Sequence, residues 1–313
     1  MTDKPIIHIL GAGALGSLWA TKLSKDNRIV LLLKKIDEKR SHQFRFIDKN
    51  QTTTITLPCE CSTPTPQDSR PIDTLLVFTK SYDTLNAVQQ LRNRLTPSSR
   101  IVLFQNGMGS QQEITQLLPG NPIYAASTTE GANRPDSQTV VYAGKGETWV
   151  GSISNQNNSS ESEKVLSLLS GSGLSVSYNS AIWEKLWLKL AINCAINPFT
   201  ALLNCKNGEL VGQPLFDANI TPLCHELERV MKVNNINKNA DELEALVKEV
   251  IEKTANNVSS MLQDVRAGKQ TEIEYINGYI ELVAKNCDDT FPTNLVLLKR
   301  VRSSCKPHIN TGT

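Results

Sequence analysis

The spacing of hydrophobic and polar positions changes near residue 179. Before this point, short apolar runs without alternation are separated by segments with helical spacing. Such runs are typical of strands buried on both faces of a parallel sheet. After this point only helical spacing occurs, and a chain of 313 residues is long enough for two cores. The pattern predicts an α/β domain with a parallel sheet over residues 1–179, followed by an all-α domain over residues 180–313.

The apolar runs of the first domain predict its strands. These cover Ile6–Leu10, Ile29–Leu33, Asp73–Phe78, Arg100–Phe104, Ile123–Ala126 and Leu174–Tyr178, and Val140–Val150 is expected to form a hairpin. The second domain is expected to begin with a helix within Leu186–Thr200, which Pro198 should bend or end. Its other expected helices are Pro214–Val233, a helix capped by Asp241 and ending at Lys253, Thr254–Asn286, with a bend at Gly268 as an alternative to a straight helix, and Asn294–Ser304.

A glycine-rich turn directly follows the first apolar run. It consists of Gly11, Ala12, Gly13, Ala14, Leu15 and Gly16. Between a strand and a helix, such glycines permit a tight turn, let a pyrophosphate approach the backbone and allow close packing of the helix on the strand. The helix N-terminus favours phosphate. The motif predicts a Rossmann-type dinucleotide-binding domain, with a purely structural glycine turn as the alternative.

Charged and polar residues at the strand ends select the cofactor. Lys34 and Lys35 end the second strand, where a cation accepts a 2′-phosphate and an acid would hold a free ribose hydroxyl. NADP(H) is therefore favoured over NAD, although solvated lysines remain an alternative. Lys80 and Asn106 follow later strands at the edge where open α/β sheets bind ligands, and either could instead be a helix cap.

The helix within Leu186–Thr200 carries a narrow polar stripe. Lys189, Asn193, Asn197 and Thr200 are separated by steps of four, four and three residues, so they share one helical face. The remaining residues are nearly all apolar. A buried ammonium with two carboxamides is costly unless a polar group meets it, which favours a functional site. The alternative is a surface helix with a thin solvated edge.

Composition excludes several classes of function. A net charge of +2 gives no reason to expect nucleic acid or an anionic membrane as partner. The first apolar run is too short for a signal peptide, and no window approaches the roughly 18 apolar residues of a membrane span. We therefore expect a cytoplasmic protein. Seven cysteines are interpreted as reduced thiols, and the Cys59/Cys61 pair lacks the partners of a zinc site, so no metal is expected.

Carbonyl reduction by NADPH requires a proton donor. The four histidines offer poor candidates: His8 lies within a strand, for example, and His308 lies in the tail. Lys189 is the remaining choice, because apolar surroundings and the nearby Lys185 should lower its pKa toward neutral pH.

Four segments, spread in order between about Ile6 and about Val301, point to one family. They are GAGALGSLWA, QNGMG, KLAINCAINPFTALLNCKNGEL and NNVSSMLQDVRAGKQTEIEYING. These segments resemble the ketopantoate reductase (2-dehydropantoate 2-reductase) family. The resemblance implies NADPH-dependent reduction of 2-dehydropantoate to (R)-pantoate in pantothenate synthesis, by a protein that is a monomer or a homodimer.

The resemblance also implies residue roles. Lys189 falls on the proton donor. Substrate contacts are implied at Asn106, Asn193, Asn197, Asn207, Asn257 and Ser260. Cofactor contacts are implied at Gly11 to Gly16, Lys35, Lys80, Asn106, Ala132 and Glu272. On the helix expected over Thr254–Asn286, Asn257 and Ser260 would share a face.

Two residues depart from the family pattern. Lys35 replaces an arginine at the phosphate-reading position, so a bidentate grip becomes a point charge. Asp83 replaces an uncharged glutamine beside Lys80. Two alternatives stay open: a related NADP-dependent reductase of another branched 2-oxo acid, and a non-catalytic NADP(H) sensor.

Overall fold

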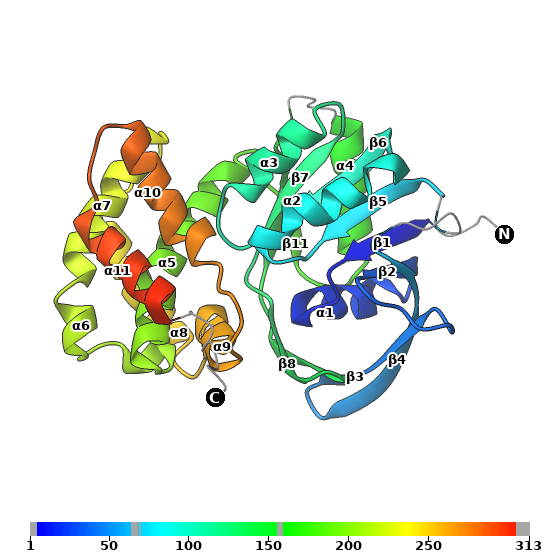
Figure 1. Cartoon of the computed structure of the whole chain (residues 1–313), viewed down its shortest axis with the longest axis horizontal. Helices are drawn as coiled ribbons and strands as arrows, with labels where there is room; N and C mark the ends of the chain where they lie inside the picture. The colour runs from blue at the N-terminus through cyan, green and yellow to red at the C-terminus, as the bar shows by residue number, and fades with distance from the viewer. Residues whose placement is uncertain (1–4, 64–67, 69, 155–158, 305–313) are drawn as a thin grey trace, which may run out of the picture. The chain divides into compact units, whose positions relative to one another are not determined.

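The computed structural model describes residues 5–63, 68, 70–154 and 159–304 (Figure 1). The chain divides into a sheet unit, Met1–Gln105 with Ser110–Lys185, and a helical unit, Asn106–Gly109 with Leu186–Thr313. The division between the units therefore falls inside helix α5 (Ile182–Leu203) and not at residue 179. The reason is that the first turn of α5 packs on the sheet unit, where Lys185 Nζ lies 4.5 Å from the centroid of the Trp149 ring.

A mainly parallel sheet forms the centre of the first unit, as the apolar runs predict. Among the described residues, eleven strands are ordered β11-β10-β7-β6-β5-β1-β2-β4-β3-β9-β8. The parallel core consists of β1 (Ile6–Leu10), β2 (Arg28–Leu33), β5 (Ile72–Val77), β6 (Leu95–Leu103) and β7 (Ile123–Thr128). Neighbouring residues of β1 enter opposite cores, Ile9 with Trp19 and Leu10 with Val88, which explains why its apolar run does not alternate.

Helices cover both faces of this sheet (Figure 1). One face packs against α1 (Ala14–Leu23) and α4 (Ser159–Ser170), and the other against α2 (Ser81–Gln90) and α3 (Ser110–Leu117). The unit therefore has the layered architecture of a Rossmann-type domain.

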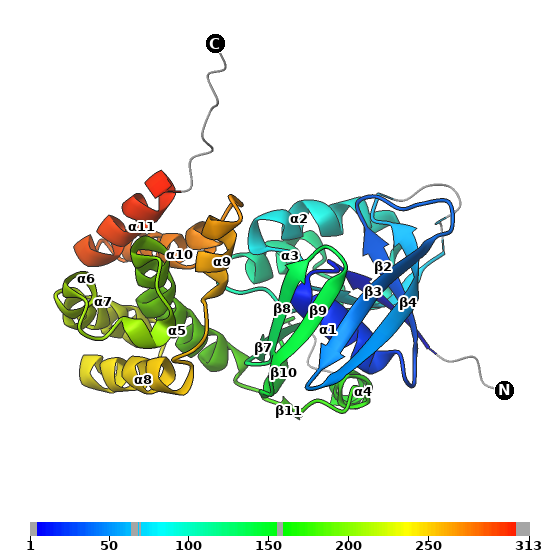
Figure 2. The same cartoon turned by 90° about the horizontal axis from the view of Figure 1, so that it is seen from below.

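A mixed extension of the sheet was not predicted in full. It comprises β3 (Ser41–Asp48), β4 (Gln51–Cys61), β8 (Gly131–Asp136) and β9 (Thr139–Gly144). These strands pass over α1, where Phe44 and Phe46 join Trp19 in one core (Figure 2). The hairpin expected over Val140–Val150 is wrong, because β9 pairs with β8 whereas β10 (Thr148–Ser152) pairs with β7 and with β11 (Val176–Tyr178).

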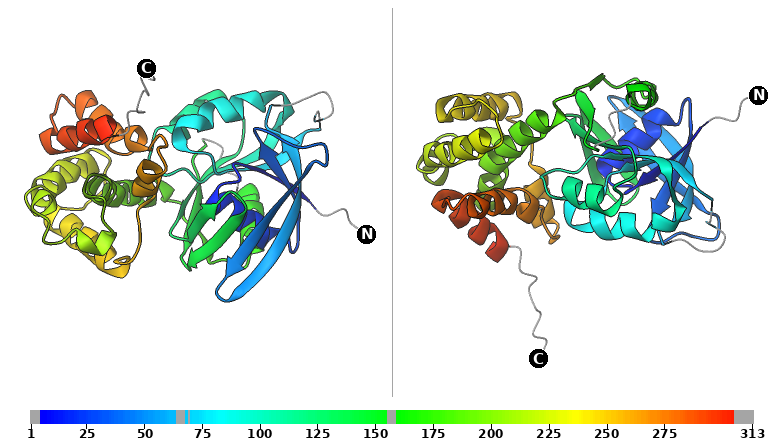
Figure 3. Two further views of the ribbon diagram at one scale, coloured as in Figure 1. Left: turned by 60° about the horizontal axis from the view of Figure 1, so that its bottom comes forward. Right: turned by 90° about the horizontal axis from the view of Figure 1, so that it is seen from above.

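The second unit is helical, as predicted, and α5 lies among its other helices (Figure 3). These are α6 (Pro214–Asp217), α7 (Ile220–Val233), α8 (Ala240–Lys253), α9 (Ser260–Arg266), α10 (Asn277–Asn286) and α11 (Pro292–Ser304). By length and composition α5 could cross a membrane, but 67% of its most apolar window is buried inside the chain. It therefore has the character of a core helix.

Three local expectations for this unit are corrected. Pro198 does not end α5, which continues to Leu203. Asn239 and not Asp241 caps α8, because Asn239 Oδ1 accepts a hydrogen bond from Glu242 N at 2.9 Å. The long helix expected from Thr254 is instead α9, the short 3-10 helix η4 (Ile273–Tyr275) and α10, so Asn257 precedes α9 and shares no helical face with Ser260.

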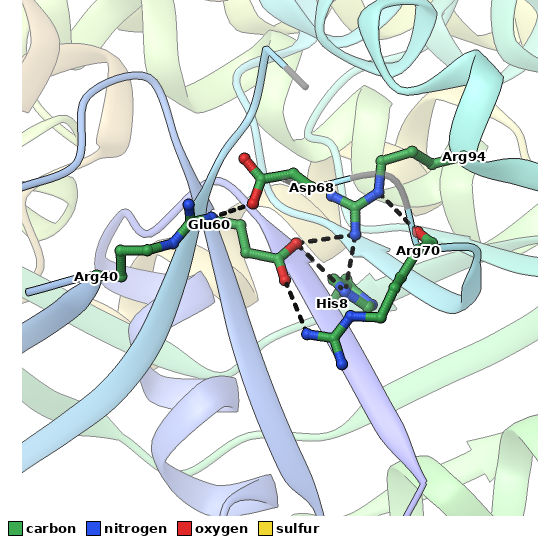
Figure 4. Close-up of polar contacts among 6 residues, drawn as sticks. All are labelled: His8, Arg40, Glu60, Asp68, Arg70 and Arg94. Atoms are coloured by element: carbon green, nitrogen blue, oxygen red, sulfur yellow. Dashed lines mark hydrogen bonds and ion pairs between the residues drawn. The ribbon is translucent and has the colours of Figure 1, made fainter. Parts of the chain in front are cut away.

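A buried polar cluster surrounds the histidine of β1 (Figure 4). Arg94 Nη2 lies 2.8 Å from Glu60 Oε2 and 3.4 Å from His8 Nε2, and Arg94 Nε donates to Arg70 O at 2.9 Å. Burial, followed by the positive charges of Arg94 and Arg70, lowers the pKa of His8 to about 4. His8 is thus a neutral part of the folded sheet at pH 7.

This shift predicts that acid destabilises the protein through His8. The unfolded chain binds the proton near the ordinary pKa of about 6.5 and the folded chain only near 4. Stability is therefore lost as the pH falls from about 6.5 to about 4, by roughly 3 kcal/mol at most. Denaturant unfolding followed across this pH range should show a smaller loss in a His8→Leu variant than in the parent.

The matched control for this measurement is His225→Leu, which removes an exposed histidine of α7. It should leave the pH dependence of the parent unchanged. A His8→Leu variant with an unaltered acid profile would show that His8 does not couple stability to pH.

Candidate active site

The glycine turn between β1 and α1 combines two crowded glycines with an open one. A Cβ at Gly11, whose φ is +99°, would lie 2.7 Å from the carbonyl carbon of Phe78, and one at Gly16 would lie 2.0 Å from the oxygen of Gly11. At Gly13 no atom lies within 4 Å of the same position. Gly13 is also the N-cap of α1, whose first turn holds no acidic residue. The free N–H groups there suit a pyrophosphate.

Cofactor-selecting candidates lie at the neighbouring strand ends. Lys34 Nζ donates to Asp83 Oδ2 at 3.1 Å, so the first lysine after β2 is paired with the residue that departs from the family pattern. Lys35 is exposed. Lys80 is the N-cap of α2, and Ala132 of β8 packs against the core that includes α1. All of the predicted cofactor residues except Asn106 and Glu272 therefore lie in the sheet unit, on the elements around the glycine turn.

The segment after β6 belongs to the helical unit. Gly107 has a φ of +79°, and a Cβ there would lie 2.3 Å from Tyr275 O, so only glycine fits this approach. The same Tyr275 oxygen accepts a hydrogen bond from Met108 N at 2.8 Å. These contacts hold Asn106 near η4, whose N-cap is Glu272. Asn106 and Glu272, which are far apart in the sequence, therefore belong to one local structure of the helical unit.

The ammonium of the α5 stripe has altered acidity. Burial lowers the pKa of Lys189 to about 8, and the carboxylate of Glu272 partly offsets this effect. Glu272 is itself buried, and its carbonyl oxygen accepts hydrogen bonds from Tyr275 N and Ile276 N. The expected contribution of Lys185 is not found, because its ammonium lies over the Trp149 ring. The carboxylate of Glu272 is therefore a counter-charge for Lys189, which lies on a largely apolar helix.

The far end of the stripe is tied to α9. Thr200 is fully buried, and its Oγ1 lies 2.7 Å from Ser259 Oγ. Ser259 Oγ in turn accepts a hydrogen bond from Leu262 N, which caps α9. Ser260 is the exposed first residue of that helix. Sequence reasoning missed Ser259, although a serine before a helical run is a recognisable N-cap signal.

Two of the predicted asparagines meet beside α8. Asn207 N donates to Asn257 O at 3.1 Å, and Asn207 Nδ2 donates to Thr254 Oγ1 at 2.8 Å. The buried Oδ1 of Asn207 has no hydrogen-bond partner within the described part of the chain. A buried acceptor without a partner is costly, so this oxygen suits a ligand that donates a hydrogen bond.

The opposite side of α5 is fixed by a buried network. Asn277 Nδ2 donates to Asn294 Oδ1 at 2.9 Å and lies 3.0 Å from Cys194 Sγ. The carboxylate of Glu226 accepts hydrogen bonds from Thr293 N and Asn294 N, both at 2.8 Å, at the start of α11. These contacts hold the helix that carries Lys189, Asn193 (partly buried) and Asn197 (buried) in one orientation.

Comparisons with known proteins identify the family of this chain. The family model "Ketopantoate reductase PanE/ApbA" matches residues 7–155, and "Ketopantoate reductase PanE/ApbA C terminal" matches residues 181–304. The chain belongs to the ketopantoate reductase family. It is 32% identical over 307 residues to 2-dehydropantoate 2-reductase of Shigella flexneri, which covers 98% of this chain and 97% of that protein.

Relatives of the family are found in distant organisms. The 2-dehydropantoate 2-reductase of Archaeoglobus fulgidus is 32% identical over 299 residues, covering 95% of this chain and 96% of that protein. A ketopantoate reductase from Ralstonia eutropha JMP134 has the same fold, with a TM-score of 0.83 at 22% identity over 96% of this chain and 98% of that one. D-mandelate dehydrogenase in complex with NADH and anilino(oxo)acetate also shares the fold, with a TM-score of 0.87 at 22% identity and the same coverage.

The unpartnered oxygen of Asn207 gives a test of this part of the site. An Asn207→Ala variant should raise the KM for ketopantoate about tenfold, because one buried hydrogen bond to the ligand is lost. The KM for NADPH should change less than about twofold. Thr254→Val is the control, because it removes the internal bond of Asn207 but leaves Oδ1 in place; a rise in KM in this control as large as that in Asn207→Ala would contradict the assignment.

Proposed function

We propose that this chain catalyses the NADPH-dependent reduction of 2-dehydropantoate (ketopantoate) to (R)-pantoate, a step of pantothenate and coenzyme A synthesis, in the cytoplasm. The observation that carries the proposal is the ammonium of Lys189, whose pKa is lowered to about 8 within an apolar helix that also bears two asparagines. Family membership agrees with it.

The proton in this proposal comes from Lys189. NADPH supplies a hydride to the ketone carbon of the substrate. Lys189 donates its proton to the carbonyl oxygen as negative charge develops there, and the product is the secondary alcohol. A pKa of about 8 leaves the amine mostly protonated at neutral pH but makes it a better acid than an ordinary lysine. The carboxylate of Glu272 favours the protonated form before the reaction.

The amides of the helical unit would bind the 2-oxo acid. A carboxylate and a ketone need hydrogen-bond donors, and amides with one hydroxyl supply them at a lower desolvation cost than further cations would. The residues assigned to the substrate are Asn106, Asn193, Asn197, Asn207, Asn257 and Ser260. Among them Asn207 would act as an acceptor for a substrate hydroxyl, because its Nδ2 already donates to Thr254 and its Oδ1 has no partner in the described part of the chain.

The glycine turn and its neighbours would bind the cofactor. The open backbone at Gly13 receives the pyrophosphate, and Lys35 receives the 2′-phosphate. The residues assigned to the cofactor are Gly11 to Gly16, Lys35, Lys80, Asn106, Ala132 and Glu272. The chain would act as a monomer or a homodimer; a Staphylococcus aureus ketopantoate reductase with the same fold, a TM-score of 0.79 and 16% identity is described as dimeric.

The proposal predicts that the protein oxidises NADPH when ketopantoate is added, and that Lys189→Met lowers kcat at least a hundredfold with little change in NADPH affinity. Because the acid must be protonated, the rate of the parent should fall as the pH rises through about 8. Absorbance at 340 nm follows the reaction.

Lys185→Met is the matched control, since it removes the lysine one turn earlier that lies over Trp149. It should retain turnover. Faster oxidation with another branched 2-oxo acid would favour a different substrate, and NADPH binding without turnover on any 2-oxo acid would favour a sensor. Full turnover in Lys189→Met would remove this residue from the chemistry.

The Lys34–Asp83 pair predicts an effect on cofactor choice. The carboxylate of Asp83 pairs with Lys34, the neighbour of the Lys35 that would receive the 2′-phosphate, so it weakens the attraction for NADPH more than that for NADH. Asp83→Asn should therefore raise the ratio of kcat/KM for NADPH to that for NADH about threefold. Asp136→Asn, which removes an equal charge from a pair with Arg45, serves as control. A lower ratio in Asp83→Asn would contradict this assignment.

A further inference from the structure

Arg134 of β8 reaches the glycine turn from a distant part of the chain. Its Nη1 donates to Ala12 O and its Nη2 donates to Ser137 O, so one guanidinium connects the β8–β9 hairpin with the turn. Strands β8 and β9 lie over α1 (Figure 2). Sequence reasoning gave no role to this residue, which is 122 positions away from Ala12.

The bond to Ala12 O controls the direction of a neighbouring donor. In a trans peptide the carbonyl of Ala12 and the N–H of Gly13 lie in one plane and point in opposite directions. The Ala12 oxygen also accepts a hydrogen bond from Ser17 Oγ at 3.2 Å, so it is held from two elements. Gly13 is the glycine whose surroundings are open. Fixing the carbonyl therefore fixes the direction of the Gly13 N–H.

Arg134 also brings charge to a turn that has none of its own. The six residues from Gly11 to Gly16 carry no ionisable side chain. Burial, followed by the positive charge of Arg134, lowers the pKa of His42 on strand β3. The buried Nε of Arg134 and the buried Nε2 of His42 have no hydrogen-bond partner among the residues that the structure describes. The charge thus lies close to the turn, and no acidic side chain in the described part of the chain forms an ion pair with it.

Contacts other than those of Arg134 hold the β8–β9 hairpin in place. Val140 is fully buried in the core with Trp19 of α1, and Ala132 and Tyr142 pack against the same core. Tyr142 also donates a hydrogen bond to Glu130 Oε2 at 2.7 Å. Apolar burial and the Tyr142 hydrogen bond hold the hairpin. The hydrogen bond from Arg134 to the turn is therefore not required for this purpose.

We propose that Arg134 is a cofactor-positioning residue, which orients the Gly13 N–H through the Ala12 carbonyl and adds positive charge beside the dinucleotide pyrophosphate. This inference rests on the proposed NADPH-dependent function. It differs from 2′-phosphate reading, because the pyrophosphate is common to NADPH and NADH. Loss of Arg134 should therefore weaken both cofactors equally.

The test measures cofactor binding without turnover, by quenching of intrinsic fluorescence. In Arg134→Met the Kd values for NADPH and for NADH should both rise about tenfold, with the ratio between them unchanged. The dependence of log Kd on log salt concentration should become shallower, because one cation near the phosphates is lost. Arg134→Lys should restore the charge but only part of the affinity, since it cannot reproduce both hydrogen bonds.

Two further variants distinguish a role of Arg134 in orienting the glycine turn from a role in holding the strands together. Arg45→Met removes an arginine that donates to Thr139 Oγ1 at 2.7 Å and so joins β3 to β9 without reaching the turn. Its Kd values should match those of the parent. Ser17→Ala removes the second bond to Ala12 O without a change of charge, and should raise both Kd values about threefold with an unchanged salt dependence.

The outcomes are distinguishable. Unchanged Kd values in Arg134→Met, or a loss confined to NADPH, would overturn the role of Arg134 while leaving the proposed function intact. A similar loss in Arg45→Met would assign the effect to strand bracing and also overturn it. If Arg134→Met fails to fold, parent-like binding in both Arg134→Lys and Ser17→Ala would count against it. A parent protein that binds neither cofactor would instead contradict the proposed function.

Discussion

The ammonium of Lys189 within an apolar helix is the constraint on which the helical unit depends. Removing a charge from water is costly, so the helix must be held in an orientation that meets this charge with a counter-charge. Glu272 supplies that counter-charge, and burial still leaves the pKa of the lysine near 8. The network of Asn277, Asn294 and Glu226 on the other side keeps α5 from rotating its polar stripe away. The packing that lowers the pKa of Lys189 therefore also holds α5 in a fixed orientation.

In the sheet unit, too, the packed frame and the candidate binding residues lie in different parts of the structure. Apolar strands form the frame, while the turn at their edge is shaped by glycines that no larger residue could replace. The cost of a buried polar group is met locally in both units: Arg94 and Glu60 surround the neutral His8, and Thr200 bonds to Ser259. In each case a buried polar group meets a polar partner from another part of the chain, which lowers the cost of its burial.

Features with a local, periodic signature could be predicted from the sequence. The central strands, the glycine turn and the α5 stripe are of this kind, because burial on both faces or on one helical stripe leaves a readable pattern. Strands β3 and β4 were missed, since each has few buried apolar residues, Phe44 and Phe46 in β3 and Leu57 and Cys59 in β4. The break before α9 was missed although its cap, Ser259, offers a local N-cap signal. The contact of Arg134 with Ala12 could not be read at all, because it depends on how the sheet curves. Ligand roles of the individual residues stay predictions.

The placement of Asn106–Gly109 makes the helical unit discontinuous in sequence. A fragment that begins at Leu186 would lack the segment that donates to Tyr275 O, and would leave the surface of η4 bare where Gly107 now fits against it. No single cut can therefore divide this chain into two intact modules. During synthesis, the helical half is complete only when a loop made much earlier finds residues that emerge last, so its final folding step is long-range and comparatively slow.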